Sequence, residues 1–387
     1  MRIETITTAE GFAALCDAWD DLALRAPAPS VFLRHAWFAA AWAWRRDDSE
    51  LRILVAREGD AIAAILPLIR LRGNGARRRV FTLLTVPDTQ CCDLVVDRAL
   101  AGAAASTIAQ ALASRRDWDV LILDYLAEDG VIATHLAPEL EHRGVRVALE
   151  ERGRNLYIPL AGAFDRYWST RTRSVKKACN LAANRLQRAG AVRIEHVGPG
   201  AMSEVDCDRA LDAAIEVSGR SWKRATGNSL DHAAPGNFIR ALSGAARREG
   251  WLSVWLAYLD ERPVAMEYQL VYGGNVHALR SDFDAELDQV SPGSFLFRHL
   301  LERLFDGGLA QYLMGPGDNA YKMRWTSDGH ALRRLTAYHG TPRGRLAYWI
   351  EQRAKPLLRP LRDRMRRRAG VDRADDGSAA GKRGPLR

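Results

Sequence analysis

The order in which strands and helices are predicted to follow one another is the feature that most constrains the fold of this chain. In each half of the sequence, hydrophobic periodicity predicts a strand, two helices, three strands, a helix, a strand, a helix and a strand, or nearly so. The halves share no obvious sequence identity, so only the order of elements repeats. This order predicts an α/β (α+β) fold with two lobes, each a mixed central sheet flanked by helices.

We expect three regions along the chain. Residues 1–160 form the first lobe, and residues 161–345 form the second lobe, which begins with a long basic helix predicted over Phe164–Ala189. Residues 346–387 form a basic tail that is partly disordered, because the composition of 370–387 is rich in Gly, Asp, Ala and Arg. A length of 387 residues suits two domains or one large one.

The positive charge of the chain is concentrated at its C-terminal end. The formal net charge is +9, and Thr341–Arg387 holds 14 Lys and Arg against 5 Asp and Glu, which is the whole excess. The folded body is therefore neutral overall and does not by composition predict nucleic-acid binding. Basic residues beside Trp349 and several leucines suit peripheral attachment to an anionic membrane. A solubilising tail and an RNA contact are open alternatives.

The sequence also bears on location and on metal binding. The first residues lack a basic region followed by an apolar core, and no apolar run approaches the ~18–20 residues of a membrane helix. We therefore expect a cytoplasmic protein, and peripheral contact with the inner face of the membrane remains open. The five cysteines are odd in number and form no CxxC pattern, which favours free thiols. The nine histidines form no HxxxH or HExxH pattern, so we expect no metal site.

A helix that begins directly after a turn of small residues is the strongest candidate for a binding site. A strand is predicted over Val276–Phe283, and Ser291-Pro292-Gly293-Ser294 precedes an amphipathic helix. The free N–H groups and the dipole of a helix N-terminus favour an anion. Gly293 would let a phosphate approach the backbone, and Ser291 and Ser294 can donate from their hydroxyls. Ser-Pro-Gly is also an ordinary turn and helix start, and the turn alone favours that simpler interpretation.

Short motifs surround this turn in a recognisable order. They are Phe32-Leu33 and Trp37, then Ser174, Lys177 and Asn180, then Trp222 and Gly227, then Asp282-Phe283-Asp284, Ser291-Pro292-Gly293, and Tyr321-Lys322 with Arg324-Trp325. Together they resemble acyltransferases of the GNAT superfamily, specifically the BioF-like acetyltransferase domain found with FemAB-type proteins and cellulose-biosynthesis-associated acyltransferases. The resemblance covers about Val31 to Trp325 and rests on order and spacing. Phe283 departs from it, because no hydroxyl is available there.

The resemblance implies two GNAT-like lobes, with acyl-CoA held by the second. The first lobe has no matching glycine turn, since Val96-Asp97-Arg98 precedes its Ala-rich helix, so we expect no cofactor there. The pyrophosphate would lie at Ser291, Pro292, Gly293 and Ser294, and the pantetheine arm would pair with strand backbone. The implied reaction is attack of an amine or hydroxyl on a thioester. Such a transfer needs proximity, a base for the proton and donors for the developing oxyanion.

Four polar residues are candidates for this chemistry. Asp282 and Glu267, expected on neighbouring strands, could accept a proton or hold an amine, although either alone is more typical of a surface carboxylate. Tyr321 could protonate the leaving thiolate, and Lys322 could bind phosphate or an anionic acceptor. Without a functional role, Tyr321 would be a packed core side chain and Lys322 a solvated surface lysine. The cations of the long helix could meet a phosphorylated or carboxylated acceptor, but a solvated helix face is the commoner meaning of such a run. They are Arg171, Arg173, Lys176, Lys177 and Arg185.

The leading hypothesis is an acyl-CoA-dependent N- or O-acyltransferase, with acetyl-CoA or another acyl-CoA as donor and a small molecule or a glycan of the cell envelope as acceptor. One alternative is a FemX-like transferase that uses aminoacyl-tRNA. Another is a non-catalytic GNAT-fold assembly protein. Nucleic acid is expected only as tRNA under the first alternative, and the sequence does not predict an oligomeric state.

Overall fold

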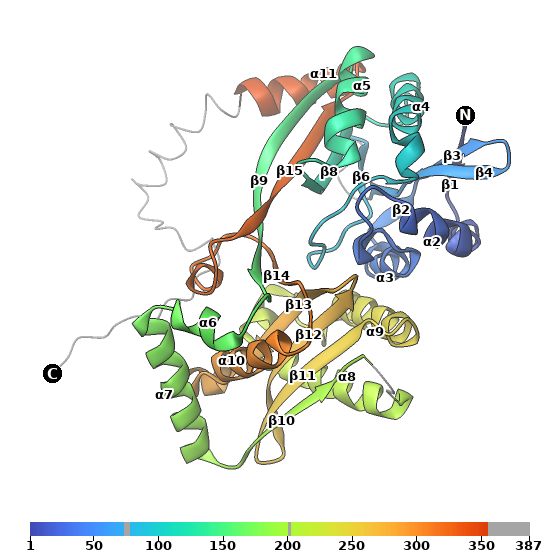
Figure 1. Ribbon diagram of the computed structural model, residues 1–387. Coiled ribbons are helices and arrows are strands. Elements are labelled where there is room, and N and C mark those ends of the chain that lie inside the picture. Colours follow the sequence, from blue (N-terminus) through green and yellow to red (C-terminus); the bar gives the residue numbers. More distant parts are fainter. Residues whose placement is uncertain (73–77, 200–202, 355–387) are drawn as a thin grey trace.

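The structure, a computed structural model, describes residues 1–72, 78–199 and 203–354 (Figure 1). A turn predicted at Gly73-Asn74-Gly75 and the predicted disorder of 370–387 lie outside these residues. Strands and helices alternate as the sequence predicts and build two sheets flanked by helices, so the expected α/β class is confirmed.

The strands are short in the first half and longer near the centre of the chain. They are β1 (Arg2–Ile6), β2 (Ser49–Leu51), β3 (Ile53–Glu58), β4 (Ala61–Leu66), β5 (Leu68–Leu71), β6 (Val80–Leu83), β7 (Val95–Val96), β8 (Val120–Ala127), β9 (Arg146–Pro159), β10 (Val192–Val197), β11 (Leu252–Leu259), β12 (Arg262–Tyr272), β13 (Asn275–Phe283), β14 (Gln311–Pro316) and β15 (Gly329–Tyr338).

The helices flank these strands. They are α1 (Ala9–Ala13), α2 (Cys16–Leu24), α3 (His35–Arg45), α4 (Ala101–Ser114), α5 (Ala137–His142), α6 (Phe164–Ser169), α7 (Arg173–Ala189), α8 (Glu204–Gly219), α9 (Ala233–Arg248), α10 (Pro292–Phe305) and α11 (Pro342–Tyr348). Four short helical turns also matter below, namely η4 (Trp222–Thr226), η5 (Ala285–Val290), η6 (Lys322–Arg324) and η7 (Trp349–Ala354). None of the helices in the described ranges is long and apolar enough to cross a membrane.

One continuous sheet joins the two halves of the chain. Its order is β10-β11-β12-β13-β14-β9-β15-β8-β6-β5-β2, and a second sheet has the order β1-β3-β4-β7. The long strand β9 pairs with β14 near its end and with β15 along most of its length. Figure 1 shows β9 and β15 running together from one half to the other. The last strand of the second expected region therefore lies between two strands of the first.

Two local predictions are wrong, and each has a backbone reason. The single helix predicted over Phe164–Ala189 is interrupted after Ser169, and α7 restarts at a cap in which the Thr172 side chain accepts from the N–H of Val175 at 3.4 Å. Hydrophobic alternation also predicts two strands, over Val145–Glu150 and Asn155–Leu160, but they form one strand, β9, because pairing with β15 continues across the break.

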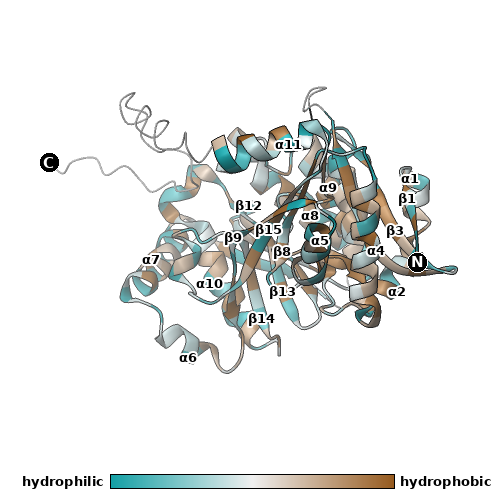
Figure 2. Ribbon diagram, turned by 90° about the horizontal axis from the view of Figure 1, so that it is seen from above, coloured by the Kyte–Doolittle hydropathy of each residue, from teal (hydrophilic) through white to brown (hydrophobic). Residues whose placement is uncertain are grey.

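The largest hydrophobic core continues from one half into the other. Trp37 of α3 and Phe238 of α9 are fully buried, and their rings meet edge to face at 5.4 Å between centroids. Burial of each such side chain contributes roughly 1.5–3 kcal/mol. Figure 2 shows β3 coloured as a hydrophobic strand, in agreement with the burial of its first four residues.

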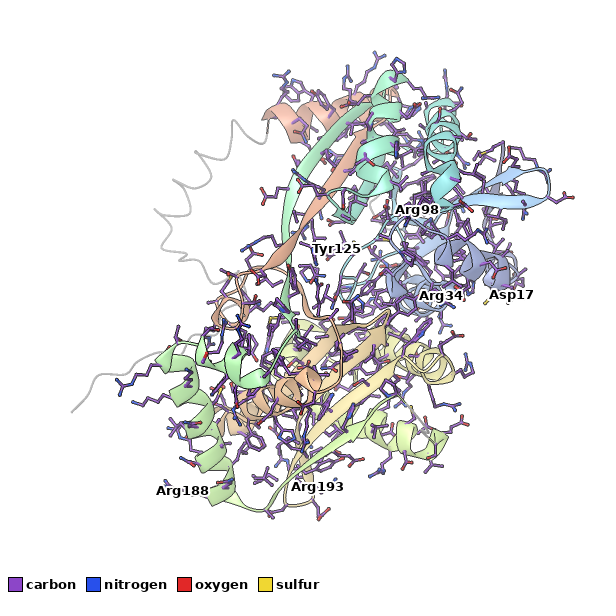
Figure 3. All side chains as sticks on the ribbon, in the orientation of Figure 1. Asp17, Arg34, Arg98, Tyr125, Arg188 and Arg193 are labelled. Carbon is purple, nitrogen blue, oxygen red and sulfur yellow. The ribbon has the colours of Figure 1, made fainter. Side chains whose placement is uncertain are left out.

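Arg34 makes a polar contact between the halves. It pairs with Asp20 at 2.9 Å in the first half and reaches Glu249 at 3.5 Å in the second. Its guanidinium also lies 4.8 Å from the ring of Trp251. Figure 3 labels Arg34 at this junction. Packing and charge together therefore fix the two halves against each other.

Candidate active site

The parallel strands β13 and β14 separate before either of them ends. The last residue of β13 that pairs with β14 is His277, whereas the strands continue to Phe283 and Pro316. We call the ends that no longer pair with each other (278–283 and 314–316) the strand fork. Peptide groups in separated strands lack ladder partners and can hydrogen-bond an extended ligand that carries amides.

A side chain from the first half of the chain reaches into the strand fork. Gln90 Nε2 donates to the carbonyl oxygen of Ala278 at 2.7 Å. Gly315, with φ +81°, faces the same point, because a Cβ there would lie 3.7 Å from the Ala278 carbonyl, from Gln90 Nε2 and from Lys322 Nζ. The sequence did not predict that the first lobe takes part in the site.

Lys322 is held at the strand fork by backbone carbonyl groups. Its Nζ donates to the carbonyl oxygen of Gly315 at 2.7 Å and to that of Pro316 at 2.9 Å. Burial lowers the pKa of Lys322 to about 8, and Asp318 opposes this shift. The lysine is therefore half-buried and fixed in place, which differs from the solvated lysine that the sequence left open.

The predicted turn before α10 is present, but Ser291 is turned toward the preceding residues. Ser291 has φ +54°, and its N–H donates to the carbonyl oxygen of Leu287 at 3.2 Å. Its hydroxyl donates to the carbonyl oxygen of Asp288 at 3.1 Å. Pro292 is buried and has no N–H to offer. The Ser294 N–H donates to the carbonyl oxygen of Ser291 at 3.1 Å. The groups of this turn that suit an anion are therefore the N–H of Gly293 and the hydroxyl of Ser294.

Gly293 lies close to the aromatic ring at the end of β13. A Cβ at this position would lie 3.2 Å from Cδ1 of Phe283, which is tighter than an ordinary contact. Phe283 and the start of α10 are thus adjacent, at the same edge of the sheet as the strand fork. An elongated ligand along the strand fork would meet the positive end of the α10 dipole there.

Glu267 of β12 is a buried carboxyl group, not a surface carboxylate. It is 1% exposed, and its Oε1 accepts hydrogen bonds from the Tyr312 hydroxyl and from Gln269 Nε2, the latter at 2.8 Å. Burial raises the pKa of Glu267 to about 7, although the bonds from Tyr312 and Gln269 oppose the rise. A carboxyl group with this pKa can accept and release a proton near neutral pH.

Asp282 is also buried, but it lies on the opposite face of the sheet from Glu267. Glu267 pairs directly with Ser281, the neighbour of Asp282, and side chains alternate between faces along a strand. Asp282 accepts from the Ser218 hydroxyl of α8 at 2.7 Å and forms an ion pair with Lys223 of η4. The two carboxyl groups are on neighbouring strands, as expected, but they do not form a catalytic pair.

Tyr321 packs beside η6 against α10. Its ring centroid is 6.2 Å from that of Phe297. Burial raises the pKa of Tyr321, and the Glu267 carboxylate raises it further. The hydroxyl therefore keeps its proton at neutral pH and can act as a donor.

A buried ion pair attaches the first half to β13. Arg280 donates from Nε to Asp88 at 2.9 Å and from a terminal nitrogen to the carbonyl oxygen of Asn228 at 2.7 Å. Both charged side chains are almost fully buried. Removing one partner of such a pair leaves an uncompensated charge, so this contact fixes the loop that carries Gln90.

Sequence reasoning missed Gln90, Asp88, Arg280, Lys223 and Tyr312. One signal was available, because Arg280 and Asp282 are two residues apart in a predicted strand and therefore lie on one face of it. Gln90 gives no local signal, since its partner Ala278 is 188 residues away in the chain. Within the described ranges, no group of three or more His, Cys, Asp or Glu could hold a metal ion.

A family comparison covers this site. Residues 173–323 match the model of the acetyltransferase (GNAT) domain, a range that begins with α7 and includes the strand fork and Lys322. The resemblance to GNAT acyltransferases proposed from the motifs is therefore confirmed for these residues. No curated protein sequence matches the chain.

Solved structures show the same fold over most of the chain. A crystal structure of FemX has 12% identity and a TM-score of 0.57, covering 91% of this chain and 100% of that one. The C-terminal domain of a putative lysylphosphatidylglycerol synthetase from Agrobacterium fabrum has 14% identity and a TM-score of 0.52, with coverages of 88% and 97%. A protein of unknown function from Bacteroides thetaiotaomicron has 9% identity and a TM-score of 0.53, with coverages of 87% and 100%.

Proposed function

Because residues 173–323 carry a GNAT acetyltransferase domain, we propose that this chain transfers an acyl group from acyl-CoA to an amine or hydroxyl of a small-molecule or glycan acceptor. The observation that carries the proposal is the buried Glu267, whose pKa of about 7 suits a general base. Glu267 lies on β12, which pairs with β13, and β13 forms one side of the strand fork.

The chemistry requires one proton to leave the acceptor and one to reach the departing thiolate. The acceptor nitrogen or oxygen bonds to the acyl carbon, the C–S bond breaks, and the electron pair stays on sulfur. Glu267 would accept the proton of the acceptor. Tyr321, which keeps its hydroxyl proton at neutral pH, would donate to the thiolate.

The donor would occupy the strand fork and the start of α10. Amides of an extended pantetheine arm suit the peptide groups of β13 and β14 that do not pair with each other, apart from the carbonyl groups that Gln90 and Lys322 already hold. The N–H of Gly293 and the hydroxyl of Ser294 suit a phosphate. Lys322 adds positive charge at the same edge and holds the end of β14 in place.

A direct assay tests the proposal. Acetyl-CoA and longer acyl-CoA thioesters would be incubated with the full chain and pooled amines or sugars, and free thiol would be measured. We expect acceptor-dependent thiol release that falls at least about 100-fold in Glu267→Gln. Absence of both acyl-CoA binding and turnover would overturn the proposal and favour a non-catalytic GNAT-fold protein.

A second donor, aminoacyl-tRNA, is favoured by one observation. Helix α7 contains Arg173, Lys177 and Arg188, all exposed, and has no acidic residue. No ion pair to these three side chains is found within the described residues. Figure 3 shows Arg188 at the outer end of this helix. Unpaired cations on one helix suit the phosphates of a nucleic acid.

Charge reversal separates the two donors. In the triple variant Arg173→Glu, Lys177→Glu, Arg188→Glu, we expect acyl-CoA affinity to change less than about threefold if the donor is acyl-CoA, because the contacts proposed above are elsewhere. Loss of tRNA binding together with no acyl-CoA turnover by the unaltered chain would instead support the second donor.

A further inference from the structure

Helix α11 and the turn η7 expose two large apolar side chains and direct one acidic side chain toward the protein. Leu346 is 57% exposed and Trp349 is 59% exposed. Glu351, in contrast, forms an ion pair with Arg78 at 2.8 Å and accepts from the Tyr338 hydroxyl at 3.0 Å. The buried side of α11 consists of Gly344 and Ala347, so Leu346 and Trp349 lie on the solvent side, whereas large apolar side chains of a surface helix usually face the core.

The position of α11 is fixed, so the exposure does not result from a loose end. A Cβ at Gly344 would lie 2.2 Å from the carbonyl oxygen of His339, which shows how closely the helix backbone approaches the strand end. Thr341 caps the helix by accepting from the N–H of Gly344 at 3.1 Å. The Thr341 hydroxyl also donates to the buried Asp119 at 3.0 Å.

Arginines flank the exposed apolar residues. Leu346, Trp349 and Arg353 recur at three- and four-residue spacing and therefore follow one line along the segment. Arg343 and Arg345 lie on either side of this line, and all three arginines are exposed. We call these five residues the α11 face. Figure 2 shows α11 at the periphery of the molecule, with hydrophilic and hydrophobic turns side by side.

We propose that the α11 face docks on the surface of an anionic lipid bilayer. Trp and Leu side chains enter the boundary between headgroups and acyl chains, while long arginine side chains remain with the lipid phosphates. The sequence that follows the α11 face is also positively charged, since residues 355–387 contain 11 Lys and Arg against 4 Asp and Glu. A free phosphate or a nucleic acid would be attracted by the positive charge, but neither offers an apolar environment in which the exposed Leu346 could be buried.

Vesicle flotation of the full chain tests this surface. The vesicles would contain either phosphatidylcholine alone or phosphatidylcholine with about a third phosphatidylglycerol, at low and at high salt. We expect binding to the anionic vesicles at low salt, with at least about tenfold weaker partitioning for Leu346→Ser/Trp349→Ser and for Arg343→Glu/Arg345→Glu. Transfer to a soluble acceptor should not change in either variant.

A matched control replaces exposed apolar residues elsewhere. Leu24 of α2 and Val205 of α8 are 56% and 75% exposed, so Leu24→Ser/Val205→Ser removes a similar apolar area and should bind vesicles like the unaltered chain. Any of three results would overturn the proposal. They are no flotation at low salt, equal binding by Leu346→Ser/Trp349→Ser, and a dimer that this variant abolishes in a chain that does not bind vesicles.

Discussion

Glu267 is proposed to act as the general base, and its buried carboxylate also lowers the stability of the fold. If it is the base, transfer should fall as pH decreases through about 7, where the carboxylate becomes protonated. Glu267→Gln keeps an oxygen that can accept from Tyr312 and Gln269, so the fold should be retained. We expect a loss of about 100- to 10,000-fold in kcat, together with loss of this pH dependence, measured by thiol release.

The same residue predicts how stability varies with pH. The pKa of Glu267 rises from 4.5 to about 7 on folding, so between these values the native state binds more protons than the unfolded chain. Its contribution to the free energy of unfolding therefore falls as pH rises across this window. We expect Glu267→Gln to be more stable than the unaltered chain at pH 8, by roughly 1–3 kcal/mol, and equally stable near pH 4.5. Chemical denaturation at the two pH values checks this, and a less stable variant at pH 8 would contradict it.

Lys322 should matter to both stability and donor affinity. Lys322→Met keeps the length of the side chain but removes the hydrogen bonds to the carbonyl oxygens of Gly315 and Pro316. We expect a loss of roughly 1–3 kcal/mol in the free energy of unfolding and a rise in the KM for the donor. Lys176→Met, which removes an exposed hydrogen bond to Ser169 at 2.9 Å, is the control and should change neither quantity much. Native kinetics in Lys322→Met would show that the lysine only supports the end of β14.

At the scale of elements, periodicity predicted most of the structure because most helices and strands bury one face. The strands β11, β12 and β13 follow the predicted order around predicted turns. The break between α6 and α7 was missed because the Thr172 cap competes with a continuous helix in a way that apolar spacing does not record. The strand fork could not be predicted from periodicity either, because it depends on which strands pair and on where their pairing stops.

The helix start at α10 yields a prediction that separates charge from crowding. Gly293→Asp places a carboxylate where the phosphate of the donor is proposed, so acyl-CoA affinity should fall by more than about tenfold. Gly293→Ala is the matched control, because both substitutions bring a Cβ to 3.2 Å from the Phe283 ring and only one adds charge. Calorimetric titration with CoA and thermal melting would be compared. Equal losses of affinity in the two variants would mean that space, not charge, limits binding there.

At the scale of the whole molecule, the candidate site belongs to both halves of the chain. Gln90 enters the strand fork, and Asp88 pairs with Arg280, so residues of the first half complete a site built on β13 and β14. A likeness to FemX over 91% of the chain agrees that both halves form the fold. The element order predicted two lobes, but it could not show that they share a sheet, because strand pairing across more than a hundred residues leaves no periodic signal.

The shared sheet predicts that the halves do not fold alone. β15 lies between β8 and β9, so a fragment of residues 1–160 lacks the strand that joins two of its own. Its exposed strand edges should make it aggregate or remain unfolded. A fragment of residues 161–387 would keep β15 without either partner strand. We therefore expect a single cooperative calorimetric transition for the full chain, no cooperative transition for either fragment, and recovery of structure when both are refolded together. A soluble 1–160 fragment with its own cooperative melting would contradict this, because the pairing of β15 would then be dispensable for the first half.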